Sequence, residues 1–336
     1  MTEPADLIVI GAGPAGLAAA SLASKHNLSV LLLDEQAAPG GQIYRNIEHN
    51  ITHESETCAI LGAEYAYGAA LAETCRASDV TYTPGATVWR IDPDGSVAYS
   101  VNGAAHTAKG RRIILATGAL ERPVPIPGWT LPGVMTAGAA QTLLKASAML
   151  PSGRVVVAGT GPLAMLVTLQ LIDAGADIAA LLETTRKRDY FSNAMLLPGA
   201  MAGQDYLRRG MAMRRAIRAS GVPIYGGVTE LEARGDGQVS SVRGRSGGER
   251  LTFEIDTLLV HDGVVPNIQA TRQVGCEHEW YEPQRYWRPV RDSWGTTSID
   301  TITVAGDGAG ISGARAAEYL GQLAALDAAC RLDKIS

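Results

Sequence analysis

The chain has 336 residues, of which 46% are hydrophobic and 19% are charged. This composition is typical of a folded α/β protein long enough for two domains, and it excludes disordered and fibrous chains. The formal net charge of -5 provides no basic surface for phosphate backbones, which excludes nucleic acid as a partner.

Two stretches, residues 7–24 and 155–172, carry no charged side chain but contain Gly and Pro. The residues ahead of the first stretch include Glu3 and Asp6 and no Lys or Arg, whereas a signal peptide begins with basic residues. We therefore predict no membrane span and a cytoplasmic location.

The first nucleotide signature is "DLIVIGAGPAGLAAASLA", in which a strand at residues 7–10 precedes a helix rich in small residues. Gly11, Gly13 and Gly16 form a G-x-G-x-x-G pattern, which allows a tight turn and places a pyrophosphate on the positive end of the helix. The next strand, "SVLLLDE", ends in Asp34. Its carboxylate can accept both hydroxyls of an adenosine ribose and would repel a 2′-phosphate.

Three later segments favour FAD over NAD at this site: a glycine pair, a strand that returns to the cofactor, and a Gly-Asp turn. The acid of the last segment suits a ribityl hydroxyl. The segments are "APGGQIYR" with Gly40, Gly41 and Gln42, "RRIILATGALERP" with Ala116, Thr117 and Gly118, and "TITVAGDGAG" with Gly306 and Asp307.

With its motifs in this order, the chain resembles the two-dinucleotide flavoproteins of the pyridine nucleotide-disulfide oxidoreductase superfamily. The resemblance implies an α/β fold with two Rossmann-like dinucleotide-binding domains, as in glutathione and thioredoxin reductases. We expect an FAD domain at residues 1–130 and 280–336, with an inserted NAD(P)-like domain at residues 131–279. The chain is expected to cross from the FAD domain to the inserted domain in the Pro-rich segment "RPVPIPGWTLPG".

The inserted domain contains a second segment with a strand, a glycine turn, a helix and a further strand. Its sequence is "GRVVVAGTGPLAMLVTLQLIDAGADIAALLE". It contains Gly159, Gly161 and, in place of the third glycine, Ala164; its second strand ends in Glu183, which favours NAD. Arg186, Lys187 and Arg188 follow and could equally receive the phosphate of NADP. The sequence leaves open whether this site binds NAD(P), binds another adenine nucleotide, or serves structure only.

The cysteines Cys58, Cys75, Cys276 and Cys330 form no CxxC pair, so the chain lacks the redox-active dithiol of a disulfide reductase. This usage indicates a reducing compartment without a disulfide framework. Cys276 and His278 form an isolated Cys-x-His, and we predict no metal site.

Longer segments, among them "LATGALERPVPIPGWTLPGVMTAGAAQTLLK" and "VAGDGAGISGARAAEYLG", resemble the flavin-containing α subunit of heteromeric amine and amino-acid dehydrogenases. That family includes the hydrogen cyanide synthase middle subunit, opine oxidase, hydroxyproline or proline dehydrogenase α subunits and the related part of sarcosine oxidase. The resemblance implies that the amine is oxidised at a flavin of a separate β subunit, and that this chain passes the electrons onward.

The sequence assigns no catalytic residue, and because the flavin carries the redox chemistry no side chain has to act as a nucleophile. The resemblance carries over Gly11, Gly13, Gly16, Asp34, Gly41, Gln42 and Asp307 as FAD contacts, and neighbouring residues of the motifs complete the predicted set. The FAD contacts are Gly11, Gly13, Pro14, Ala15, Gly16, Asp34, Glu35, Gln36, Gly41, Gln42, Val88, Ala116, Thr117, Gly118, Gly306 and Asp307. The contacts to a second nucleotide are Gly159, Gly161, Leu163 and Glu183.

Many members of this family continue into a cysteine-rich [2Fe-2S] domain, whereas Cys330 is the only cysteine after Cys276 in this chain. The expected partners are a second flavoprotein (β) subunit with its own flavin, such as FMN, and a small iron-sulfur subunit, unless the chain was shortened. The alternatives are a stand-alone NAD(P)H-dependent flavoprotein reductase and a non-catalytic scaffold that binds nucleotides.

Three further features remain open in the sequence. Tyr44 and Arg45 could line the flavin, form a partner interface or pack a loop. His261 could be an acid-base group or a structural histidine. Residues 277–298 hold three of the five tryptophans, and we predict a loop-rich surface that contacts another subunit or roofs the flavin, with core packing as the competing interpretation.

Overall fold

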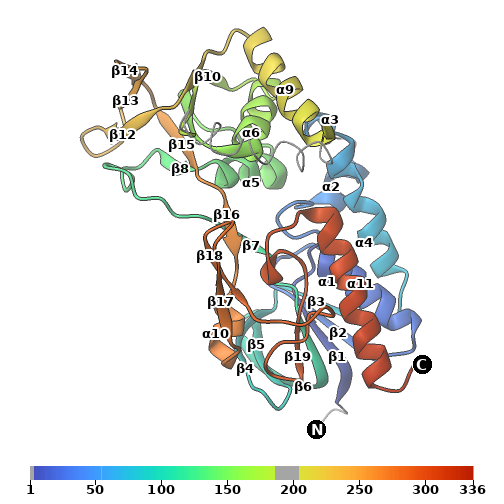
Figure 1. The fold of residues 1–336 in the computed structure, drawn as a ribbon. Coiled ribbons are helices and arrows are strands. Elements are labelled where there is room, and N and C mark those ends of the chain that lie inside the picture. Colours follow the sequence, from blue (N-terminus) through green and yellow to red (C-terminus); the bar gives the residue numbers. More distant parts are fainter. Residues whose placement is uncertain (1–3, 54, 186–203, 336) are drawn as a thin grey trace. The chain divides into compact units, whose positions relative to one another are not determined.

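The computed structural model describes residues 4–53, 55–185 and 204–335 (Figure 1). The chain forms two compact units, one of Met1–Leu120 with Val264–Ser336 and one of Glu121–Gly263. Both divisions lie earlier in the chain than the domain limits expected from the sequence. Residues 264–279 group with the first unit because Val274 and Cys276 are part of one of its cores.

The first unit is built on a sheet with strand order β3-β2-β1-β6-β5-β4, and β19 pairs with β6. Strands β3, β2, β1, the second half of β6 and β19 are parallel, whereas β4, β5 and the first half of β6 are antiparallel. The strands are β1 (Ala5–Ile10), β2 (Val30–Asp34), β3 (Val80–Pro84), β4 (Thr87–Ile91), β5 (Ser96–Val101), β6 (Ala104–Leu115) and β19 (Ile302–Val304).

The helices and smaller elements of this unit surround that sheet. The helices are α1 (Pro14–Lys25), α2 (Ile47–Thr52), α3 (Glu56–Ala66), α4 (Gly68–Arg76), α10 (Gln269–Val274), α11 (Ala314–Arg331) and the 3₁₀ helix η3 (Gly306–Ala309). The hairpin strands are β17 (His278–Tyr281) and β18 (Tyr286–Pro289). Where the chain leaves and re-enters the unit, β7 (Ala119–Glu121) pairs with β16 (Val264–Pro266).

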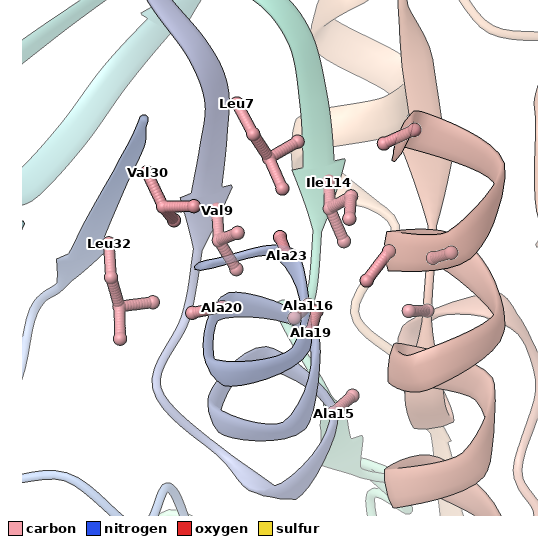
Figure 2. Packing of buried hydrophobic residues seen from close by; sticks show 14 of the residues in the cluster. Leu7, Val9, Ala15, Ala19, Ala20, Ala23, Val30, Leu32, Ile114 and Ala116 are labelled. Atoms are coloured by element: carbon pink, nitrogen blue, oxygen red, sulfur yellow. The ribbon is translucent and has the colours of Figure 1, made fainter. Parts of the chain in front are cut away.

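The core of the first unit lies where α1 and α11 meet the parallel strands. Leu7–Ile10 are all buried, as expected for a strand covered on both faces. Most of the buried side chains of α1 are alanines, and such small side chains allow a helix to approach its neighbours closely. Figure 2 shows these side chains among those of the sheet: Ala15, Ala19, Ala20 and Ala23 beside Leu7, Val9 and Ile114.

The second unit has a parallel sheet with strand order β11-β10-β9-β15-β8. Helices α5 and α6 cover one face, and an antiparallel sheet, β12-β13-β14, contributes to the core on the other face. The strands are β8 (Val134–Thr136), β9 (Arg154–Gly159), β10 (Asp177–Glu183), β11 (Ile224–Gly226), β12 (Thr229–Arg234), β13 (Ser241–Ser246), β14 (Glu249–Glu254) and β15 (Thr257–His261). The described helices are α5 (Ala137–Ser147), α6 (Gly161–Asp173) and α9 (Gln204–Ala219).

Each unit therefore contains a strand, a glycine turn and a helix followed by a second parallel strand, as the sequence predicts. In the described part of the chain, no helix is both long enough and apolar enough to cross a bilayer.

The contact between α1 and α11 gives a stability prediction. A Cβ atom on Gly321 would lie 2.1 Å from the carbonyl oxygen of Ala15, so Gly321→Ala must push the two helices apart. We expect this change to lower the free energy of unfolding by about 1–3 kcal/mol in chemical denaturation.

Gly210 in α9 is the matched control, because a Cβ atom there meets no atom within 4 Å. Gly210→Ala should raise stability by up to about 1 kcal/mol through helix propensity. Equal stability of the two variants would contradict the close approach of α1 and α11.

Candidate nucleotide-binding sites

The first glycine turn follows β1 and is pressed against the end of β6. Gly11 has a φ of +103°, and a Cβ atom there would lie 2.5 Å from the carbonyl oxygen of Ala116. Gly13 caps α1 without a side-chain hydrogen bond, and Pro14 occupies the first turn. The first N–H groups of α1 thus lack a side-chain acceptor, the arrangement that binds a phosphate.

The glycine pair after β2 lies directly against this turn. The backbone N–H of Gly40 donates to the carbonyl of Ala12 at 2.8 Å. Gly41 has a φ of +60°, and a Cβ atom there would lie 2.8 Å from the Cα atom of Gly13. The structure therefore brings the two predicted glycine segments together, with the exposed Gln42 next to them.

Asp34, at the end of β2, is buried and holds the glycine turn through its carboxylate. Oδ2 accepts a hydrogen bond from the N–H of Ala12 at 2.6 Å, and Oδ1 accepts one from the N–H of Gln36 at 2.8 Å. Burial raises the pKa of the Asp34 carboxyl, and these two N–H groups act in the opposite direction. A carboxylate has further lone pairs, so Asp34 can still accept ribose hydroxyls.

Glu35, the neighbouring acid, differs from Asp34 in its surroundings. Its side chain is exposed and accepts a hydrogen bond from the side-chain amide of Gln36 at 3.2 Å. Of the two predicted acids, Asp34 is therefore the one directed at the glycine turn.

Arg45 connects the two glutamines that flank the glycine pair. Its guanidinium donates to Oε1 of Gln36 and, at 3.1 Å, to Oε1 of Gln42. Its backbone carbonyl accepts from the hydroxyl of Tyr65 at 2.7 Å. The Nε atom of Arg45 is buried without a hydrogen-bond partner among the described residues, so it offers a donor to a bound group. Tyr44, in contrast, is buried and packs against Gly68.

The end of β6 meets the Gly-Asp turn that follows β19. Thr117 Oγ1 donates to the carbonyl of Asn267 at 3.0 Å, and the N–H of Asn267 donates to the carbonyl of Gly118 at 2.9 Å. A Cβ atom on Gly308 would lie 3.2 Å from Thr117 Oγ1. Asn267 is not among the residues predicted from the sequence, although its Pro-Asn pair is part of the motif "HDGVVPN".

Asp307 has one carboxylate oxygen engaged by the protein. Its Oδ1 accepts from the N–H groups of Ser312 and Gly313 at 2.8 and 3.0 Å, at the start of α11. No hydrogen bond within the described residues ends on Oδ2. The second oxygen is thus available to a ligand hydroxyl, which is the role that the sequence predicts.

Val88 lies in β4, partly buried at the edge of a core cluster. The turn just before it is tied to the end of β2, because Gly85 and Ala86 donate to the carbonyls of Gln36 and Asp34 at 3.0 and 2.7 Å. The structure therefore places Val88 near the Asp34 end of the site, where its contact with a cofactor remains a prediction.

These contacts bring the predicted FAD residues to one edge of the sheet. Strands β1, β2, β6 and β19 are parallel, so their carboxyl ends lie together, where open α/β sheets bind ligands. The glycine cradle, the acids at both ends and the unpartnered Nε atom of Arg45 fit a dinucleotide such as FAD.

The second glycine turn follows β9 in the second unit. A Cβ atom on Gly159 would lie 1.9 Å from the carbonyl oxygen of His261, so the turn is held against the end of β15. Gly161 has a φ of +84° and open space around it. Leu163 packs against the core, so its contact with a nucleotide would come from its backbone.

Glu183, at the end of β10, is already paired. Its Oε1 accepts a hydrogen bond from Nη1 of Arg214 on α9 at 2.7 Å. The sequence interpretation did not include Arg214, and the three basic residues it considered, Arg186, Lys187 and Arg188, lie outside the described residues.

The aromatic segment at residues 277–298 forms the β17–β18 hairpin and the loop after it. Trp280, Trp287 and Trp294 are 45–46% exposed, so core packing is the wrong interpretation for them. Tyr286 is buried, and its hydroxyl accepts from the N–H of Ile311 at 3.0 Å, beyond the Gly-Asp turn. A role of the tryptophans in partner contact remains a prediction.

The comparisons with known proteins agree with this geometry. The family model described as pyridine nucleotide-disulphide oxidoreductase matches residues 5–325, so the chain belongs to that family. The crystal structure of T. acidophilum thioredoxin reductase superposes with a TM-score of 0.70 at 20% identity, over 98% of this chain and 99% of that chain. These matches confirm the predicted fold of two Rossmann-like domains and the class of FAD-dependent oxidoreductases.

Within this class the chain belongs with a narrower group of enzyme subunits. An opine oxidase subunit of Agrobacterium tumefaciens is 42% identical over 341 residues, which cover 98% of this chain and 66% of that protein. Hydrogen cyanide synthase subunit HcnB of Pseudomonas aeruginosa is 31% identical over 334 residues, covering 95% and 69%. The chain spans about two thirds of the length of these relatives, and the family recognised from its motifs is confirmed.

The first site gives a prediction for Asp34. In Asp34→Asn one of the two backbone N–H groups loses its acceptor and the negative charge is lost. We expect the dissociation constant of FAD to rise about ten- to a hundredfold, measured by flavin fluorescence. Glu35→Gln, at the exposed neighbouring position, should change it less than about threefold; similar losses in both variants would contradict the assignment of Asp34.

The second site gives a prediction for Arg214. Without its guanidinium, the Glu183 carboxylate is unneutralised and repels a 2′-phosphate more strongly. In Arg214→Met we expect the affinity ratio of ADP to 2′,5′-ADP to rise about tenfold in calorimetric titrations. Arg215→Met, an exposed position on the same helix, should leave the ratio unchanged, and an equal shift there would show a general charge effect.

Proposed function

We propose that this chain is the FAD-bearing electron-transfer subunit of a multi-subunit amine or amino-acid dehydrogenase. The observation that supports the proposal is the first site itself: a glycine cradle with an acid at each end, in a chain whose four cysteines include no CxxC pair. A chain with this cradle and without a dithiol can pass electrons through the flavin but cannot relay them to a disulfide.

The described residues divide the binding of FAD among themselves. Asp34 holds the adenosine ribose, and the start of α1 holds the pyrophosphate beside Gly13 and Gly41. Asp307 Oδ2 accepts a ribityl hydroxyl. Bound FAD supplies reversible uptake and release of electrons, so the side chains bind and orient it and none has to act as a nucleophile.

The role as a subunit is supported by the names of the relatives, which are subunits of opine oxidase and of hydrogen cyanide synthase. By analogy, the substrate of the complex is an opine, proline, hydroxyproline, glycine or sarcosine. The partners are a second flavoprotein (β) subunit, which receives electrons from the amine, and a small iron-sulfur subunit, which passes them onward. FMN and a [2Fe-2S] cluster belong to these partners.

A second candidate function is a stand-alone NAD(P)H-dependent flavoprotein reductase. The second glycine turn favours it, because Gly159 and Gly161 have the motif positions of a nucleotide site and an acid follows at Glu183. In this function the nicotinamide nucleotide reduces the flavin of the isolated chain.

Visible spectra distinguish these functions. We expect the purified chain to show oxidised flavin absorbance near roughly 450 nm that NADH or NADPH does not bleach under anaerobic conditions. After reconstitution with the second flavoprotein subunit, the amine substrate should bleach it. Bleaching by a nicotinamide nucleotide alone would establish the reductase instead, and bound nucleotide without flavin absorbance would establish a scaffold.

A further inference from the structure

A buried histidine and glutamate form a pair at the carboxyl edge of the second unit. Nδ1 of His261 lies 2.5 Å from Oε1 of Glu121, and Oε2 of Glu121 accepts from the N–H of Gly138 at 2.9 Å. The side chains are 4% and 13% exposed, respectively. Because an ionised carboxylate can only accept, Nδ1 carries the proton, and Nε2 of His261 faces away from Glu121.

The position of His261 on β15 places its side chain beside two helix N-termini. β15 lies between β8 and β9, and these strands lead into α5 and α6 at the same edge of the sheet. Side chains alternate along a strand, so His261 shares a face with Leu259, which packs in the core beneath α5 and α6. His261 is thus on the helix side, at the start of both helices.

The two helix N-termini differ in which acceptors bind their free backbone N–H groups. The start of α5 is occupied by the carboxylate of Glu121, through Gly138. The start of α6 has Thr160 as its N-cap but no side-chain capping bond, because the Thr160 hydroxyl is bonded to that of Thr185. The uncapped N–H groups of α6 are therefore left for an anion, next to the carbonyl of His261, which accepts from the N–H of Thr160 at 2.9 Å.

The Nε2 atom of His261 takes no part in the contact with Glu121. Among the described residues no group is hydrogen-bonded to it, although the imidazole is almost fully buried. Glu121 fixes the orientation of the ring through its contact with Nδ1. When Nε2 also carries a proton, it donates to a phosphate oxygen, and the carboxylate of Glu121 is the counter-ion on the opposite side of the ring.

We propose that His261 is a ligand-binding residue of the second nucleotide site, where its Nε2 donates to a phosphate of an adenine nucleotide bound at the start of α6. Glu121 is its positioning residue. Glu183 ends β10, on the other side of β9 from His261, and is paired there with Arg214 of α9, so the adenosine ribose lies there and the phosphates extend toward His261. This inference concerns the second unit and does not depend on FAD in the first.

The test uses ADP and adenosine as probes, titrated by calorimetry into the FAD-saturated chain. His261→Asn keeps an amide near the position of Nδ1 and removes the Nε2 donor. We expect the dissociation constant of ADP to rise about tenfold or more, with adenosine affinity and melting temperature close to those of the original chain. Flavin absorbance reports the first site separately.

Two further variants complete the test. Glu121→Gln should weaken ADP binding several-fold, because an amide no longer balances the imidazolium, and His106→Asn, at an exposed histidine in β6, should have no effect. If His261→Asn does not fold, His261→Gln replaces it. Unchanged ADP binding in these His261 variants, equal losses for ADP and adenosine, or no ADP binding by the original chain would each overturn the proposal.

Discussion

The close approach of Gly11 to the carbonyl of Ala116 is the constraint on which the first site depends. With no side chain between them, the glycine turn and the end of β6 lie in van der Waals contact, and the carboxyl ends of the parallel strands form one binding edge. The acids of that edge are then placed by backbone groups: Ala12 and Gln36 orient Asp34, and Ser312 and Gly313 orient Asp307. Backbone donors hold a carboxylate in place without neutralising its charge.

The second unit has the same close approach at its glycine turn, but its acids have side-chain partners. Gly159 meets the carbonyl of His261 as Gly11 meets that of Ala116. Glu183, however, is paired with the guanidinium of Arg214, and Glu121 with the imidazole of His261. Each acid of the second site thus has a cationic or protonatable partner, so this edge presents less negative potential to a phosphorylated ligand than the first does.

Local motifs predicted much of this structure because each depends on a short segment. The glycine turns, the strand ends at Asp34 and Glu183 and the Gly-Asp turn lie at their predicted positions, since turn geometry and strand burial are encoded within a few residues.

The remaining features join segments that are distant in the sequence, and no local pattern connects them. Arg214 reaches Glu183 from α9, and Glu121 meets His261 across most of the second unit. Residues 264–279 belong with the first unit because Val274 packs in one of its cores. The Pro-rich segment upstream does not predict where the chain returns to that unit. The bridge from Arg45 to Gln36 and Gln42, in contrast, lies within a single loop and depends on how that loop folds back on itself.

The packing of Gly321 against Ala15 also bears on the order in which the molecule can be made. Helix α1, which follows the first glycine turn, is synthesised before the inserted unit, whereas helix α11, which covers α1, is synthesised after it. The inserted unit has its own sheet and cores between these two events. Synthesis therefore delivers a complete inserted unit while the flanking unit still has an uncovered alanine-rich surface, which α11 then covers.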